Sequence, residues 1–144
     1  MSLIQFMRAC RDGNECVVKS LLEQDPGLHN KQDVKGWTGL MLALHFKRHS
    51  LSRLLLSLPG LDTSIRNEVN NTALQKAYYN KAPLDIVTTL ARLSTLETIN
   101  MKNNYGDTAL MTSLSGFNST CLVVATRNYL PHAALCARTG YKHK

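Results

Sequence analysis

The stretch Asn103-Asn-Tyr-Gly-Asp-Thr-Ala-Leu110 decides the fold, because two related stretches precede it at nearly regular intervals. These are Asp33-Val-Lys-Gly-Trp-Thr-Gly-Leu40 and Asn67-Glu-Val-Asn-Asn-Thr-Ala-Leu74. Their threonines, Thr38, Thr72 and Thr108, are 34 and 36 residues apart. In each copy a leucine follows the threonine two positions later and a small residue follows it five positions later. A period of this length predicts a solenoid built from stacked repeats.

Each repeat unit is expected to contain a turn, a short helix, a tight loop and a longer helix. The threonine is suited to cap the first helix, because its hydroxyl accepts hydrogen bonds from N–H groups of the first turn. Gly36 and Gly106 allow the positive φ that a sharp turn requires, and Asn70 in the equivalent slot is a common substitute. Small residues should let adjacent first helices approach closely; they are Ala9, Ala43, Ala77 and Ser113.

The second helices carry apolar stripes that should pack between repeats. Leu22, Leu55 and Leu90 are predicted to be buried there, and truncating them should destabilise the fold. Pro26-Gly27 and Pro59-Gly60 mark where the second helix should stop. Residues 130–138 predict a short helix that covers the last repeat, with a truncated fifth repeat as the alternative.

The chain resembles the ankyrin-repeat family. The pattern D-x-x-G-x-T-x-L-x-x-A, followed by G-x-x-x-V-V-x-x-L-L, is matched best by residues 6–43 and 103–110. The resemblance implies an all-α solenoid of stacked helix-turn-helix units joined by short β-turn loops. We expect one domain over 1–144, with repeats at about 3–36, 37–70, 71–106 and 107–130 and a capping segment at 131–144.

Two family positions differ in this chain. The proline that usually follows the threonine is replaced by Gly39, Ala73 and Ala109. The histidine that usually follows the leucine is replaced by Met41, Gln75 and Met111. These replacements predict a weakened hydrogen-bond network at the turns.

The sequence contains no motif for a phosphate-binding loop or a serine nucleophile. We therefore expect no enzyme, no catalytic residue, no cofactor and no small-molecule substrate. His45 and His49 are spaced for two metal ligands on one helix. Because no third ligand is nearby and Lys47 and Arg48 lie between them, an exposed helix end is favoured over a metal site. Cys10 lies on an apolar stripe and is expected to be a small core residue.

The charge of +7 is uneven along the chain, because no Asp or Glu follows Asp107. Such a gradient suits nucleic acid, an anionic membrane surface or an acidic protein. The basic residues are scattered and form no nucleic-acid module, so nucleic acid is disfavoured. Apolar runs such as Cys121–Ala125 are too short for a membrane span. The four cysteines form no CxxC pair, which favours reduced thiols in a cytoplasmic or nuclear protein. A monomer is expected.

In proteins similar to this one, the turn tips and first helices form a concave surface that binds other proteins. The resemblance therefore implies a protein–protein interaction module with an unidentified protein partner. The tips would supply Lys35, Trp37, Val69, Asn71, Tyr105 and Asp107. The first helices would supply Met41, Leu44, His45, Gln75, Tyr78 and Met111.

Several points stay open at this stage. Trp37 fits either a binding hot spot or a lid packed over the neighbouring turn. Tyr78 and Tyr79 are adjacent, so at most one of them faces the groove. Two other functions compete with the leading one. These are a stoichiometric inhibitor that occludes an enzyme or transcription factor, and a basic adaptor for nucleic acid or anionic lipid.

Overall fold

The computed structural model of the chain describes residues 2–115. Within this range the chain forms eight α-helices and one 3-10 helix, and it forms no strand. The all-α solenoid predicted from the repeat period is confirmed. The second helix predicted for the fourth repeat and the capping segment predicted at 131–144 lie outside the described residues. The division into four repeats and a cap therefore stays a prediction.

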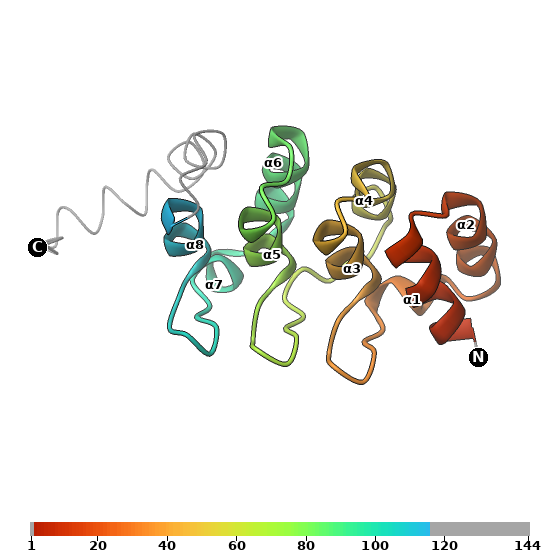
Figure 1. Ribbon diagram of the computed structural model, residues 1–144, viewed down its shortest axis with the longest axis horizontal. Coiled ribbons are helices and arrows are strands. Elements are labelled where there is room, and N and C mark those ends of the chain that lie inside the picture. The colour runs from red at the N-terminus through yellow and green to blue at the C-terminus, as the bar shows by residue number, and fades with distance from the viewer. Residues whose placement is uncertain (1, 116–144) are drawn as a thin grey trace, which may run out of the picture.

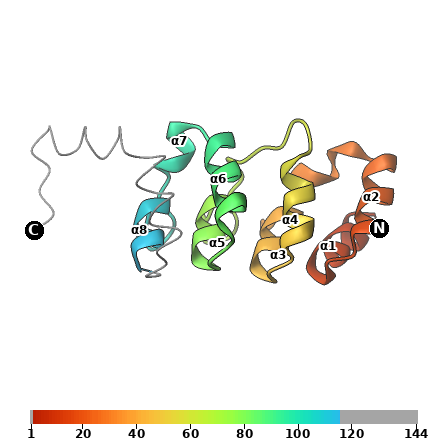
Figure 2. The ribbon, with the colours of Figure 1, turned by 90° about the horizontal axis from the view of Figure 1, so that it is seen from above.

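Three complete helix pairs and the start of a fourth lie side by side (Figures 1 and 2). The first helices of the repeats are α1 (Ser2–Asp12), α3 (Gly39–His45), α5 (Ala73–Tyr79) and α8 (Ala109–Ser115). The second helices are α2 (Glu15–Gln24), α4 (His49–Leu56) and α6 (Leu84–Leu93). The connections contain the 3-10 helix η1 (Pro26–Asn30) and the short helix α7 (Leu96–Ile99). Helices α2 and α4 end just before their Pro-Gly pairs, as predicted.

The core lies between the helix rows and continues from repeat to repeat. The small residues Ala9, Ala43 and Ala77 are buried where α1 meets α3 and α3 meets α5. Gly39, which replaces the family's proline, is tightly surrounded as well. A Cβ there would lie 2.7 Å from the Phe6 ring and 2.8 Å from the Cys10 sulfur. The missing side chain at Gly39 therefore lets α1 pack closely against α3.

The second helices bury their apolar stripes largely as predicted. Leu55 and Leu90 are fully buried. The prediction for Leu22 was wrong, because that side chain is only half-buried while Leu21 is buried in the core. Helix α2 packs mainly against α1 and η1, and these contacts cover Leu21 more fully than Leu22.

The three loops that precede the capped helices share one hydrogen-bond pattern. The side-chain oxygen of Asp33 accepts from the N–H groups of Lys35 and Trp37, both at 2.9 Å. Asn67 and Asn103 accept in the same way from the residues two and four positions later. The predicted positive φ is present in all three loops, at Gly36 (80°), Asn70 (62°) and Gly106 (81°). The three loops therefore share one conformation and one hydrogen-bond pattern.

The threonine after each loop caps the following helix, as predicted. The hydroxyl oxygens of Thr38, Thr72 and Thr108 accept from backbone N–H groups three residues later, at 3.3–3.4 Å. Two backbone hydrogen bonds then join neighbouring loops. Glu68 N–H donates to Lys35 carbonyl oxygen and Asn104 N–H donates to Val69 carbonyl oxygen, both at 2.9 Å. The three loops therefore form one continuous surface.

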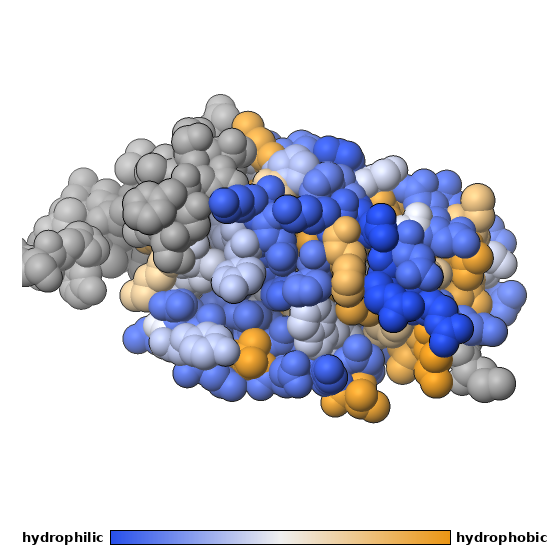
Figure 3. Space-filling view, viewed as in Figure 1, coloured by the Kyte–Doolittle hydropathy of each residue, from blue (hydrophilic) through white to orange (hydrophobic). Residues whose placement is uncertain are grey.

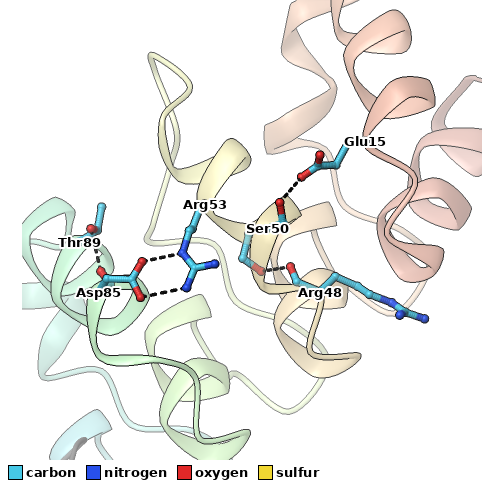
Figure 4. A network of polar contacts seen from close by, with 7 residues as sticks. Glu15, Arg48, Ser50, Arg53, Asp85 and Thr89 are labelled. Carbon is cyan, nitrogen blue, oxygen red and sulfur yellow. Dashed lines mark hydrogen bonds and ion pairs between the residues drawn. The ribbon is translucent and has the colours of Figure 1, made fainter.

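Polar contacts on the opposite side join the second helices to one another (Figure 4). Ser50 donates to Glu15 at 2.7 Å and so connects α4 to α2. Arg53 donates two hydrogen bonds to Asp85, at 2.6 and 3.2 Å, and so connects α4 to α6. These exposed contacts set the register of the stack and add little free energy individually.

Candidate functional site

The loops and the first helices together form one long face of the molecule, which we call the inner face. Figure 3 shows this side as mainly hydrophilic, with separate hydrophobic patches along the edge formed by the loops and toward the N-terminal repeat. A face of this composition resembles an ordinary transient protein interface more than a buried subunit contact.

Eight of the predicted site residues reach the surface of this face. Lys35, His45, Tyr105 and Met111 are exposed, with Tyr105 at 74% and Met111 at 43%. Trp37, Val69, Asn71 and Asp107 are half-buried. The loop residues were therefore placed on the surface correctly.

Four predicted site residues are buried instead, and the prediction that they are exposed on this face was wrong. They are Met41, Leu44, Gln75 and Tyr78, none more than 2% exposed. The reason is that each inner first helix is covered on both sides. Helix α3 packs between α1 and α5, and α5 packs between α3 and α8. Seven-residue helices in such positions have only a narrow strip left for solvent. Tyr79, at 72% exposed, is the member of the tyrosine pair that faces outward.

Gln75 connects its own repeat to the next one. Its side-chain oxygen accepts from Thr72 N–H at 2.8 Å, which completes a capping box. Its side-chain nitrogen donates to the carbonyl oxygens of Met101 at 3.2 Å and Asp107 at 2.8 Å. The weakened network predicted for the turns is therefore wrong for this repeat. Met41 and Met111 stand at the equivalent positions and have no amide to make these bonds.

The sequence analysis missed Lys76, which is the centre of a small cluster on the inner face. Its ammonium nitrogen lies 3.2 Å from Nδ1 of His45, 4.4 Å from the centre of the Trp37 ring and 5.7 Å from the centre of the Tyr79 ring. The rings of Trp37 and His45 meet edge to face at 5.1 Å. We call these four residues the Lys76 cluster.

A signal for Lys76 was present in the repeat alignment. Among the three repeats that share the turn, the position four residues after the capping threonine is Leu42, Lys76 or Thr112, so Lys76 is the only charged residue of these three. The first repeat has Arg8 at the equivalent position, 34 residues before Leu42. Trp37 covers the cluster and packs against the core, which is the lid arrangement. A binding role for its exposed part stays a prediction.

The electrostatics of the cluster follow from burial. Lys76 is only 6% exposed, and this burial lowers its pKa. Burial first and the charge of Lys76 second lower the pKa of His45. The ion pairs among residues 2–115 join Arg11 to Asp12, Lys31 to Asp25 and Arg53 to Asp85. None of them involves Lys76.

A hollow of about 290 Å³ opens beside the cluster, between two loops and helices α5 and α8. Its lining is Val69, Asn71, Gln75, Lys76, Tyr79, Asn103, Tyr105, Asp107 and Thr112. A second hollow of about 620 Å³ lies at the N-terminal repeat and is mostly apolar, with Leu3, Ile4, Met7, Val34 and Leu42 in its wall. The sequence analysis identified neither hollow.

Metal and thiol chemistry find no support in the described part of the chain. No group of three or more His, Cys, Asp or Glu side chains comes together among residues 2–115, so His45 and His49 gain no third ligand. Cys10 is buried, as predicted, and burial raises its thiol pKa to about 12. A thiol with this pKa is protonated at neutral pH and does not act as a nucleophile.

The comparisons agree with this architecture. A family model for ankyrin repeats, comprising three copies, matches residues 6–97. The chain therefore belongs to the ankyrin-repeat family. Ankyrin repeats generally mediate protein–protein interactions and are typically not enzymes. The comparison with curated proteins found no match. Among the helices of residues 2–115, none has the length and apolar character needed to cross a membrane.

Proposed function

We propose that this protein binds another protein through its inner face, without catalysing a reaction. The observation that carries the proposal is the presence of two exposed aromatic side chains in the wall of the 290 Å³ hollow. Tyr79 and Tyr105 form part of its wall, and both are largely exposed. Met111 is exposed as well, on helix α8, which also borders the hollow through Thr112. Tyrosine is favoured at binding hot spots because it buries a large area and loses little rotamer freedom.

The loops of the inner face, one of which carries Tyr105, are ordered before any partner arrives. Each loop is closed by its own Asp or Asn side chain, and neighbouring loops are joined by backbone hydrogen bonds. A surface fixed in this way loses little conformational entropy on binding, so more of the contact energy becomes affinity.

The rival function, a basic adaptor for nucleic acid or anionic lipid, needs lysine and arginine clustered on one face. Lys76 is the only basic residue in the wall of the hollow, and it is buried. Binding through desolvated aromatic surface should change little with salt, because screening does not weaken apolar burial. A stoichiometric inhibitor would use the same inner face, with an enzyme or transcription factor as the partner.

The test begins with a peptide selected from a random display library against the 144-residue chain. Its affinity is then measured for variants of two faces. Tyr79→Ala and Tyr105→Ala, on the inner face, should each weaken binding by about 10-fold or more, as hot-spot truncations do. Val17→Ala and Leu93→Ala remove exposed apolar side chains from the second helices and serve as matched controls. The proposal fails if the control variants lose affinity and the tyrosine variants do not.

A further inference from the structure

Lys76 carries a charge that the protein does not neutralise. The side chain is more than nine-tenths buried, and its ammonium group makes one hydrogen bond, to Nδ1 of His45. An ammonium group has three N–H donors, so two remain after this bond. The Trp37 ring over which it lies gives cation–π attraction but no full counter-charge. Burying a charge without a partner is costly.

No acidic side chain of this chain supplies the missing counter-charge. All ten Asp and Glu residues of the sequence fall between Asp12 and Asp107, and so within the described part. None of them lies within ion-pair distance of Lys76. Residues 108–144 contain no Asp or Glu at all. An acidic side chain that pairs with Lys76 therefore has to come from outside these 144 residues.

A second donor in the same cluster also has no partner. The indole nitrogen of Trp37 is buried and makes no hydrogen bond. Buried polar groups without partners are uncommon in folded proteins, and they deserve a specific explanation. The cluster thus contains two donor groups with unused N–H bonds, the Trp37 indole and the Lys76 ammonium group, which lies 4.4 Å from the centre of the Trp37 ring. Lys76 also lines the hollow, so an acceptor that enters the hollow can reach its ammonium group.

We infer that the hollow beside Lys76 receives an aspartate or glutamate side chain from the partner protein, with Tyr79 and Tyr105 flanking the residue that carries it. The carboxylate accepts hydrogen bonds from the free N–H groups of Lys76 and gives the buried charge its counter-ion. Charged hydrogen bonds of this kind are short and strong when water is excluded. The inference rests on the proposed function, because it specifies the chemistry recognised on the same face.

Asp107 limits which acidic segments can enter. It is the only acid in the wall of the hollow, and it repels a second carboxylate. The geometry therefore favours a single acidic residue placed at Lys76 over a run of acidic residues. Removing the charge with Asp107→Asn should strengthen the binding of an acidic probe.

The experiment is a double-mutant cycle with a peptide selected from a random display library against the 144-residue chain. The selected peptides should contain a shared Asp or Glu. Changing that residue to Asn or Gln, and changing Lys76→Met in the protein, should each weaken binding by about 10-fold or more. Making both changes should cost little beyond either one alone. Lys76→Met should keep the fold, because the equivalent position in the preceding repeat is Leu42, and a circular dichroism spectrum checks this.

Lys19→Met provides the matched control, since it removes an equally charged but exposed lysine from α2. It should leave the affinity unchanged. Selected peptides without a shared acid, or additive losses in the cycle, would overturn the inference. If Lys76→Met is silent while Tyr79→Ala weakens binding, the inference falls and the proposed function stands. If both variants are silent, the proposed function falls as well.

Discussion

Replacing Gln75 with methionine should remove the side-chain hydrogen bonds that join the third repeat to the loop that follows it, and so destabilise the fold. The side chain makes three hydrogen bonds, one to Thr72 N–H and two to the carbonyl oxygens of Met101 and Asp107. Each such bond contributes about 1 kcal/mol net, and a buried group left unpaired costs about 1–3 kcal/mol. Gln75→Met should therefore lower the free energy of unfolding by about 3 kcal/mol. Methionine already occupies the equivalent positions 41 and 111, so the loss is not steric.

The assay is urea unfolding followed by far-UV circular dichroism, with linear extrapolation to water. The matched control is Gln24→Met, which makes the same chemical change at an exposed site on α2. Exposed substitutions of this kind stay within about 0.5 kcal/mol of the wild type. If the two variants unfold at the same urea concentration, Gln75 does not connect the repeats and the reasoning is wrong.

Three further predictions use matched pairs or a single titrating group. In urea unfolding, Gly36→Ala should lower the free energy of unfolding more than Gly106→Ala does. Both glycines have φ near 80°, so the backbone strain of the two variants is similar. A Cβ at Gly36 would also lie 3.0 Å from the backbone of Asn67 in the next loop, whereas a Cβ at Gly106 would meet open space. In alkylation at pH 8 mapped by mass spectrometry, Cys16 should react and Cys10 should stay protected, because Cys10 is buried with a pKa of about 12; equal labelling would contradict its burial. The pKa of Lys76 is lowered by burial from 10.5, so the unfolded chain binds more protons just below pH 10.5. Wild-type stability should therefore rise with pH in that window relative to the Lys76→Met variant, and parallel pH profiles would show that Lys76 is not buried.

The parts of the fold that were predictable from the sequence are those fixed by short-range contacts. The capping threonines, the positive φ at Asn70 and the ends of α2 and α4 depend on residues within four positions of one another. Such contacts can therefore be predicted from residue types at fixed spacings in the repeated sequence. The repeat period then fixes how the units stack, because each unit buries its apolar faces only against its neighbours.

The site was only partly predictable because the exposure of a first helix depends on the repeats beside it. Met41 and Leu44 are buried by helices about 34 residues away in the sequence, which a local pattern does not reveal. Tyr78 and Tyr79 are the same residue type at adjacent positions, yet Tyr78 is buried and Tyr79 is exposed, because their side chains point in different directions from α5. Lys76 was missed for the opposite reason, because a lysine is expected in solvent and this one is buried beneath aromatic rings.

Hydrogen–deuterium exchange on the complex with a selected peptide tests the central claim most directly. The account predicts slower exchange in the loops 33–37, 67–71 and 103–107 and in the residues around Lys76 and Tyr79. Exchange in the second helices α2, α4 and α6 should stay as in the free protein. Protection concentrated in those second helices, or around the N-terminal hollow, with the loops unchanged, would contradict the claim that the inner face binds the partner.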